Sequence, residues 1–247
     1  KYYYQENAGQ AKALNFALEK SSGDLVAFLD SDDIWLPEKL SYSVGEFMSG
    51  NQDLLFTDSY IFNNSSDLED LSALSSMWVQ DGTYVGHSAV SEFIKGNKVP
   101  MLTVMARKAP ILQVGGFPNA KVAQDYGLWL KLLLNKYTLR GVSKPLSAYR
   151  ILEDSITVST KNKNKAILDL FLLLTKEYSG FIDSYRNEMK YWFVCYVNDN
   201  LTKDNLGEFS GYVDSFGLNN FSFRFIMGMK GILPFKTCRR KLRKIFK

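Results

Sequence analysis

The chain has 247 residues, 46% apolar and 23% charged, a composition that suits a globular protein with a sizeable core. Its net charge of +4 is uneven, because the last twelve residues, 236–247, hold seven of the 30 Lys and Arg and no acid. The rest carries 23 basic and 26 acidic residues, so we expect no nucleic-acid partner. No apolar run is long enough to span a membrane.

The first predicted elements alternate between helix and strand. Residues 9–20 have apolar side chains at helical spacing, and the apolar run 25–29 predicts a strand buried on both faces, as in a parallel sheet. The helix that follows is expected to bury Leu40, Val44 and Phe47. Alternation of this kind predicts an α/β protein.

The alternation continues through the middle of the chain. We predict strands at 53–62 and 99–107, a polar loop at 63–76, a short helix at 110–114, an amphipathic helix at 124–136, and strand segments at 137–150 that break at Pro145. From about residue 159 the pattern changes to longer helical stretches, which places a domain boundary near 158–162.

Three carboxylates, Asp30, Asp32 and Asp33, follow directly on the apolar run 25–29. In open α/β sheets, ligands bind beyond the carboxyl ends of the strands. Carboxylates this close repel one another, which favours a bound cation, and oxygen ligands suit Mg²⁺ or Mn²⁺ together with substrate phosphates. The alternative is a solvated turn that caps the next helix.

Five stretches resemble family 2 glycosyltransferases with the GT-A fold, in the order and approximate spacing of that family. They are QENAGQAKALNFAL (5–18), GDLVAFLDSDDIWLPEKL (23–40), VGGFPN (114–119), QDYGLWLKLL (124–133) and YRILEDSIT (149–157). The resemblance implies an α/β GT-A domain over 1–158, with a mixed, Rossmann-like sheet flanked by helices. That domain would lack its first βα unit, so the chain is expected to be N-terminally incomplete, and a helical region with a basic tail would follow at 159–247.

The resemblance also implies a function. Such enzymes move a sugar, with inversion, from a nucleotide-diphospho-sugar to a hydroxyl of a saccharide or lipid-linked acceptor, here in bacterial cell-surface polysaccharide biosynthesis. Asp30 and Asp32 would be the acidic pair that holds Mn²⁺ or Mg²⁺, with Asp30 also facing the nucleotide, and Asp33 would support them.

The helix at 124–136 supplies the second half of the implied site. Asp125 lies on the apolar stripe of that helix, and the resemblance makes it the general base that takes the proton of the acceptor hydroxyl. Gln124 stands where the family often has Glu. The alternative is an acid placed in a first helical turn only by the helix dipole.

The remaining implied contacts belong to the donor. The resemblance assigns donor binding to Asp30, Asn7, Lys12 and Arg150, although Lys12 also suits a solvated helix position. Leu152 replaces a His that the family often carries after Tyr-Arg, which removes one implied metal or diphosphate ligand.

Cellular location follows from two features. Cys195 and Cys238 lack metal or redox spacing and no signal peptide is visible, so we expect a reduced, cytoplasmic protein. The basic tail, with Leu242, Ile245 and Phe246 on one helical face, suits an anionic membrane surface, which would make the protein peripheral on the inner face of the plasma membrane. A solvated basic terminus is the alternative.

Two other functions stay open at this point. A haloacid-dehalogenase-like phosphohydrolase also carries a D-x-D sequence after a buried strand, but on its first strand. A degenerate transferase that only binds is the second possibility, and Leu152 favours it.

Overall fold

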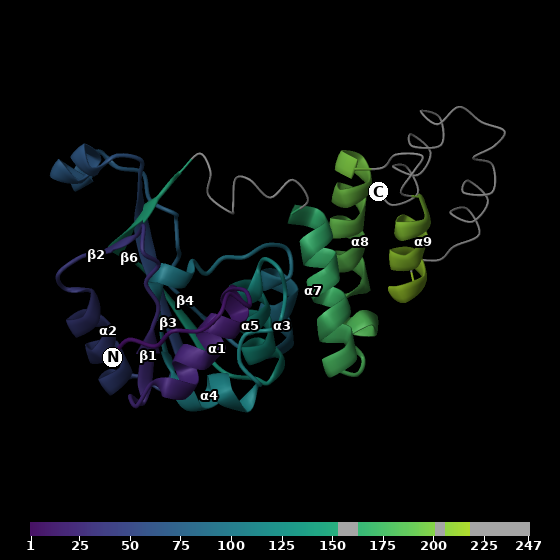
Figure 1. Ribbon diagram of the computed structural model, residues 1–247, viewed down its shortest axis with the longest axis horizontal. Coiled ribbons are helices and arrows are strands. Elements are labelled where there is room, and N and C mark those ends of the chain that lie inside the picture. The colour runs from purple at the N-terminus through teal and green to yellow at the C-terminus, as the bar shows by residue number, and fades with distance from the viewer. Residues whose placement is uncertain (153–162, 201–205, 218–247) are drawn as a thin grey trace. The chain divides into compact units, whose positions relative to one another are not determined.

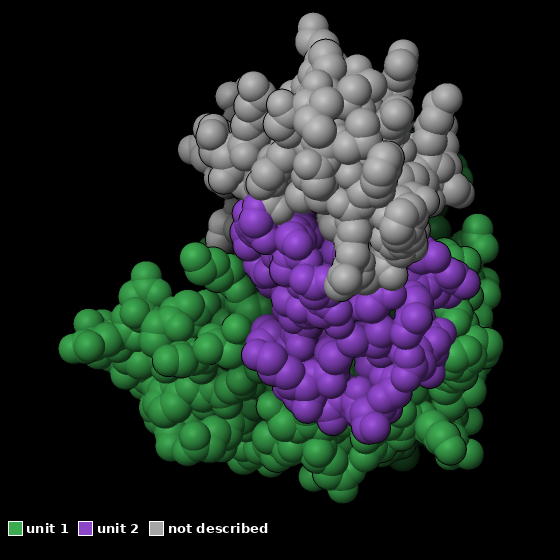
Figure 2. Space-filling view, turned by 90° about the vertical axis from the view of Figure 1, so that its right-hand side faces the viewer, with its two compact units in different colours: residues 1–160 green, residues 161–247 purple. Residues whose placement is uncertain are grey.

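The structure is a computed structural model that describes residues 1–152, 163–200 and 206–217. The chain divides into two compact units, 1–160 and 161–247, drawn in green and purple in Figure 2. The predicted tail helix at 236–247 lies outside the described residues.

The first unit is built on a mixed sheet (Figure 1) with the strand order β1-β5-β3-β6-β2, and β4 pairs with β6 beside that path. The strands are β1 (Leu25–Ala27), β2 (Ile34–Trp35), β3 (Leu54–Phe62), β4 (Gly82–Tyr84), β5 (Val104–Arg107) and β6 (Leu139–Arg150). β3 and β6 are parallel, and the other pairs are antiparallel.

Helices cover both faces of this sheet. They are α1 (Gln10–Lys20), α2 (Lys39–Ser49), α3 (Gly86–Phe93), α4 (Lys108–Gln113) and α5 (Gln124–Leu134), with short 3-10 turns at η1 (Ser65–Glu69), η2 (Leu71–Ala73) and η3 (Met101–Thr103). Figure 1 shows α2 on one side of the sheet and α1, α3 and α5 on the other. Leu55 packs with Phe47 of α2, whereas the next residue, Phe56, meets Phe93 of α3 edge to face. Successive residues of β3 therefore serve opposite layers, as strand geometry requires.

The run 25–29 differs from the prediction of a doubly buried parallel strand. β1 covers only Leu25–Ala27, pairs antiparallel with β5 and ends the strand order. All three of its residues are half-buried, because a strand paired along one edge is covered less completely than a central one. Phe28 still turns inward and meets Phe117 edge to face, while Leu29 is 47% exposed.

The α2 helix also differs from the prediction, because its buried face is rotated. Phe47 is buried as expected, but Leu40 and Val44 are 48% and 42% exposed, and Lys39 and Ser43 take the inward positions. The Lys39 ammonium donates to Thr57 Oγ1 at 3.2 Å and to the carbonyl of Thr103. Two buried acceptors therefore bind the ammonium of this lysine.

β6 is one continuous strand, where separate segments broken at Pro145 were predicted. The parallel register with β3 shifts between Thr57 and Asp58, and again between Asp58 and Tyr60. Asp58 stands opposite Pro145 within this irregular stretch. The bulge therefore accommodates a residue that has no N–H to give to the ladder.

The described part of the second unit is helical, with α7 (Lys163–Glu177), α8 (Phe181–Asn200) and α9 (Leu206–Ser215). Its core includes the stacked rings of Tyr196 and Phe209, with centroids 4.5 Å apart. Lys165 of α7 forms an ion pair with Asp169 of the same helix at 3.1 Å and another with Glu208 at 2.8 Å, and the second pair ties α7 to α9. Within the described residues, no helix combines the length and hydropathy needed to cross a bilayer.

Candidate active site

The DSDD segment forms a tight turn between β1 and β2, and its last carboxylate points back into the fold. The Asp33 N–H donates to the Asp30 carbonyl at 3.2 Å. Asp33 is buried, and its Oδ1 accepts the backbone N–H of Arg150 at 3.0 Å. Desolvation by burial raises the pKa of Asp33 to about 6, although the bond from Arg150 opposes that shift. Asp33 therefore ties the turn to the end of β6.

Arg150 brings a positive charge to this turn. Its Nε donates to the backbone carbonyl of Asp32 at 3.1 Å, and its guanidinium lies 4.8 Å from the centre of the Phe62 ring. Phe62 and Arg150 end the parallel strands β3 and β6 and are paired in register. Ligands bind beyond the carboxyl ends of strands in such sheets, and the guanidinium of Arg150, predicted to bind the donor, lies at such an end.

Asp125 belongs to the same group of carboxylates. Burial raises the pKa of Asp30 most, and the negative charges of Asp32 and then Asp125 raise it further. Because charge interactions weaken with distance and with screening, Asp125 must lie close enough for its field to act on Asp30. The fold thus brings together two carboxylates that are more than ninety residues apart in the sequence.

The position of Asp125 comes from the start of α5. Ala123, with φ of 61°, precedes the helix, and Asp125 lies half-buried in its first turn above the fully buried Leu128 and Trp129. Desolvation raises the pKa of Asp125, while hydrogen bonds from the Tyr126 backbone and from the Asn97 side chain lower it.

Asn97 is a neighbour that the sequence did not predict. Its Nδ2 donates to Asp125 Oδ2 at 2.8 Å. It lies in the short polar connection after α3, where no periodicity or motif distinguishes one polar residue from the next. Only the fold reveals that it faces a carboxylate 28 residues later.

Asn15, in the first of the resembling stretches, serves the neighbouring loop. Its Nδ2 donates to the Phe117 carbonyl at 2.9 Å, and its Oδ1 accepts the Phe117 N–H at 2.8 Å. Gly116 has φ of 69°, and a Cβ there would lie 2.4 Å from Asn15 Oδ1. The stretch VGGFPN is thus hydrogen-bonded to Asn15 of α1. A side chain at its second glycine would collide with Asn15, which explains why a glycine is needed there.

The structure does not join the other predicted donor residues to the carboxylates. Asn7 and Lys12 are exposed, and Asn7 Oδ1 accepts the N–H of Gly9 at 3.1 Å. Gln124 is buried and donates to the Gln10 side chain. Leu152, two residues beyond β6, is 39% exposed.

The carboxylates of the turn fit a divalent cation in their chemistry. In the described part of the chain, no group of three or more His, Cys, Asp or Glu is arranged to hold a metal by itself. Asp30 and Asp32 nevertheless offer two hard oxygen ligands, and burial together with the negative charge of Asp32 raises the pKa of Asp30. A cation that also took donor phosphates as ligands would relieve this repulsion.

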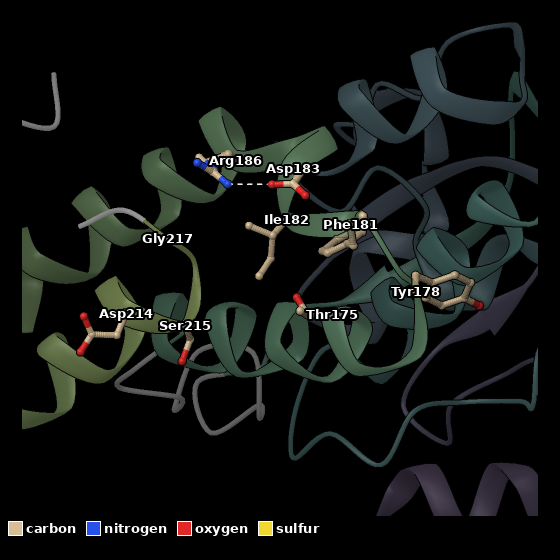
Figure 3. A pocket seen from close by; sticks show the side chains of 10 residues that line it. Thr175, Tyr178, Phe181, Ile182, Asp183, Arg186, Asp214, Ser215 and Gly217 are labelled. Atoms are coloured by element: carbon tan, nitrogen blue, oxygen red, sulfur yellow. Dashed lines mark hydrogen bonds and ion pairs between the residues drawn. The ribbon is translucent and has the colours of Figure 1, made fainter. Parts of the chain in front are cut away.

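A separate depression lies in the second unit, between the ends of α7 and α9 and the start of α8 (Figure 3). Thr175, Ile182 and Ser215 line it, together with the ion pair between Arg186 and Asp183 at 2.7 Å. It contains none of the residues that the sequence predicted for the site.

Comparison with known sequences gives the same family. Residues 1–105 match the model of glycosyl transferase family 2. The teichuronic acid biosynthesis glycosyltransferase TuaG of Bacillus subtilis is 34% identical over 171 residues, 66% of this chain and 60% of that protein. The Escherichia coli UDP-Glc:alpha-D-GlcNAc-diphosphoundecaprenol beta-1,3-glucosyltransferase WfgD is 31% identical over 60% of this chain and 54% of its own length. The chain thus spans little more than half of either relative.

Comparison with solved structures gives the fold. TarS of S. aureus, residues 1–349, in complex with UDP-GlcNAc, superposes with a TM-score of 0.61 at 16% identity, covering 96% of this chain and 71% of that one. A mannosyltransferase of Pyrobaculum calidifontis, in complex with GDP-Man and Mn²⁺, gives a TM-score of 0.50 at 14% identity and covers 98% and 64%. The predicted α/β fold is confirmed. The chain belongs to glycosyltransferase family 2 and has the GT-A fold.

Proposed function

We propose that this protein transfers a sugar, with inversion, from a nucleotide-diphospho-sugar to a hydroxyl of a saccharide or lipid-linked acceptor, in the assembly of a bacterial surface polysaccharide. The observation that carries the proposal is the electrostatic interaction of Asp125 with Asp30. It supports a site in which a base and the donor-side carboxylates act on one substrate pair. TuaG and WfgD, both named as glycosyltransferases, add support from sequence.

In this proposal Asp125 is the general base. Its carboxylate takes the proton of the acceptor hydroxyl while that oxygen bonds to the anomeric carbon, and the bond from that carbon to the diphosphate breaks on the opposite face. Partial desolvation raises the pKa of Asp125, which makes it a stronger base than an exposed aspartate. Attack opposite the leaving group inverts the anomeric configuration.

The donor diphosphate is assigned to the strand ends. Arg150, beside the DSDD turn, offers a guanidinium to phosphate oxygens, and Asp30 faces the nucleotide. The solved relatives contain UDP-GlcNAc in TarS and GDP-Man in the mannosyltransferase, which supports a nucleotide-sugar donor in this chain too. Asn7 and Lys12 stay donor-binding predictions.

Asp32 and Asp30 would hold Mn²⁺ or Mg²⁺. When bound, a divalent ion offsets the negative charge of the departing diphosphate, so that no protein acid is needed there. The Mn²⁺ in the mannosyltransferase structure supports this assignment.

The proposal assigns transfer to residues 1–158 and gives 159–247 a supporting role at a cytoplasmic, anionic membrane surface. A lipid-linked acceptor, such as the one in the name of WfgD, supports this location. Removal of 236–247 should then lower binding to vesicles that contain anionic lipid, while vesicles of neutral lipid serve as the control. Unchanged binding to the anionic vesicles would contradict the membrane role.

The proposed transfer is tested with the full-length protein, UDP- and GDP-sugars, Mn²⁺ and lipid-linked acceptors, with the anomeric configuration of the product read by NMR. Asp125→Asn should lower the kcat for transfer roughly 10²- to 10⁴-fold, to a residual rate that can still be measured, and should leave donor binding intact. Asp24→Asn, which changes an exposed acid of the same unit, should behave as wild type. Transfer at the wild-type rate by Asp125→Asn would contradict the base assignment. Donor binding without transfer by the wild type would favour the degenerate binding module.

The comparisons do not favour the phosphohydrolase alternative, since both named sequence relatives are glycosyltransferases.

A further inference from the structure

Residues 97–103 form a connection that contacts both halves of the candidate site. On the side of α5, Asn97 bonds to Asp125 and the Val99 carbonyl accepts the indole N–H of Trp129 at 3.1 Å. On the side of the DSDD turn, the Leu102 carbonyl accepts the indole N–H of Trp35 at 2.8 Å. The Lys39 ammonium bonds the next carbonyl along. Within the described residues, these four contacts join the base-bearing helix to the segment that follows the acidic turn.

The Asn97 side chain has its amide orientation fixed at both ends. Its Oδ1 accepts the N–H of Val99 at 3.1 Å, an Asx turn within the connection, and its Nδ2 donates to Asp125 Oδ2 at 2.8 Å. A flipped amide would place an N–H against an N–H and an oxygen against a carboxylate, so both contacts select the same orientation.

Asn97 is exposed, and this separates a role in the site from a role in packing. An exposed side chain contributes little buried area, so its removal leaves no cavity in the core. Its partner Asp125 is half-buried, and a hydrogen bond to a charged, partly desolvated group is stronger than one between neutral groups. Most of the effect of Asn97 should therefore fall on the carboxylate.

We propose that Asn97 is a positioning residue for Asp125. Its amide N–H fixes the orientation of the Asp125 carboxylate. The connection 97–103, which contacts both α5 and Trp35, keeps this carboxylate in a fixed position relative to the acidic turn. This proposal rests on the function proposed above, because it gives Asn97 its effect through the base. Asn97 itself needs no contact with the reacting atoms.

The test compares Asn97→Asp and Asn97→Ala in the full-length protein at mildly alkaline pH. Asn97→Asp keeps the acceptor for the Val99 N–H but replaces the donor with a second negative charge. We expect kcat to fall roughly 10- to 100-fold in both variants, with the KM for the nucleotide-sugar and the Tm unchanged. Lys98→Ala, on the same connection, removes an exposed ion pair with Glu92 of α3; it is the matched control and should keep the wild-type kcat.

A double-mutant cycle separates the proposal from a general structural effect. If Asn97 acts through Asp125, adding Asn97→Asp to Asp125→Asn causes no further loss of kcat. A further loss equal to that of the single variant would overturn the proposal, whatever the Tm. Wild-type kcat in Asn97→Asp, with a strongly lowered kcat in Asp125→Asn, would overturn it and leave the proposed base intact. Full activity of Asp125→Asn would instead refute the base and, with it, the role of Asn97.

Discussion

The backbone N–H of Arg150 donates to the carboxylate of Asp33 at 3.0 Å, across 117 positions of sequence. The same arginine sends its Nε back to the carbonyl of Asp32 at 3.1 Å. Arg150 thus bonds to two successive residues of the acidic turn, through its main chain to Asp33 and through its side chain to Asp32. The bond to the Asp32 carbonyl fixes the orientation of the Arg150 side chain. The bond from the Arg150 N–H to Asp33 fixes the acidic turn against the end of β6.

Asp33→Ala should destabilise the fold and weaken donor binding. The change leaves the Arg150 N–H without its acceptor, and an unsatisfied buried donor costs ~1–3 kcal/mol. Asp33→Asn is the matched control, because its amide oxygen can accept the same bond. Urea denaturation and calorimetric titration with UDP-sugar measure the two effects. Equal stability of the Ala and Asn variants would refute a structural role for this bond.

Metal dependence should separate Asp32 from Asp33. We expect Mn²⁺ to raise the Tm strongly only when UDP is present, because the proposed ligands include donor phosphates as well as Asp30 and Asp32. Asp32→Asn should lose this joint shift, whereas Asp33→Asn should keep it. Thermal scans with Mn²⁺, UDP, both, and both plus EDTA provide the measurement. An equal rise in Tm with Mn²⁺ alone, without nucleotide, would contradict a metal site whose ligands come from both the carboxylates and the donor phosphates.

The two glycines of the VGGFPN loop should differ in their tolerance of alanine. Both have positive φ, 78° at Gly115 and 69° at Gly116, but only at Gly116 would a Cβ meet Asn15 Oδ1 at 2.4 Å. Gly115→Ala should cost ~1–2 kcal/mol of backbone strain, and Gly116→Ala more, because it also breaks the pair between Asn15 and Phe117. Gly45→Ala, in open space on α2, is the control and should stabilise by ~0.5–1 kcal/mol. Denaturant midpoints decide the order.

Lys39 gives the fold a pH dependence of known sign. Burial lowers its pKa from 10.5 to about 7. Between these values the unfolded chain binds a proton that the folded chain does not, so the free energy of unfolding falls as the pH drops from 10.5 to 7. Below about pH 7 both states are protonated, and the full penalty, at most ~5 kcal/mol, remains.

Lys39→Met should therefore stabilise the protein more at neutral pH than at pH near 10. The variant has no ammonium to desolvate, although it leaves the carbonyl of Thr103 without this donor. Denaturation curves of wild type and variant across this range give the difference directly. Lys95→Met, at an exposed position, should show no such trend. A gain that grows with rising pH would contradict the assignment.

Periodic apolar patterns predicted most of the architecture. α5 was predicted from its stripe of Leu and Trp, which the structure buries. β3 was predicted from its apolar residues, and the structure has a strand of nine residues there. The α2 helix and its buried Phe47 were predicted correctly, but Leu40 and Val44 were wrongly assigned to its buried face. Pattern alone cannot assign Lys39 to the core, since its two acceptors lie 18 and 64 residues away.

The candidate site was predictable to the same extent. Asp30, Asp32, Asp125 and Arg150 follow recognisable elements or motifs. The fold places Arg150 against the acidic turn and Asp125 close enough for its charge to act on Asp30. Asn97 carries no local signal, because its partner is chosen by the packing of α3 against α5. Residues that act through such tertiary contacts become visible only in three dimensions.

The pairing of β6 along both edges has a consequence for how the site moves. β3 runs beside it from Leu139 to Arg150, while β4 and β2 occupy its opposite edge. Amide protons that are hydrogen-bonded within such a sheet exchange slowly, because exchange requires the sheet to open. Arg150 ends a strand that is paired with β3 along its length and with β4 and β2 over parts of its other edge, so we expect it to move less on substrate binding than the loops around it. If the proposed donor site is correct, its Arg150 side is shaped when the chain folds, before a ligand arrives.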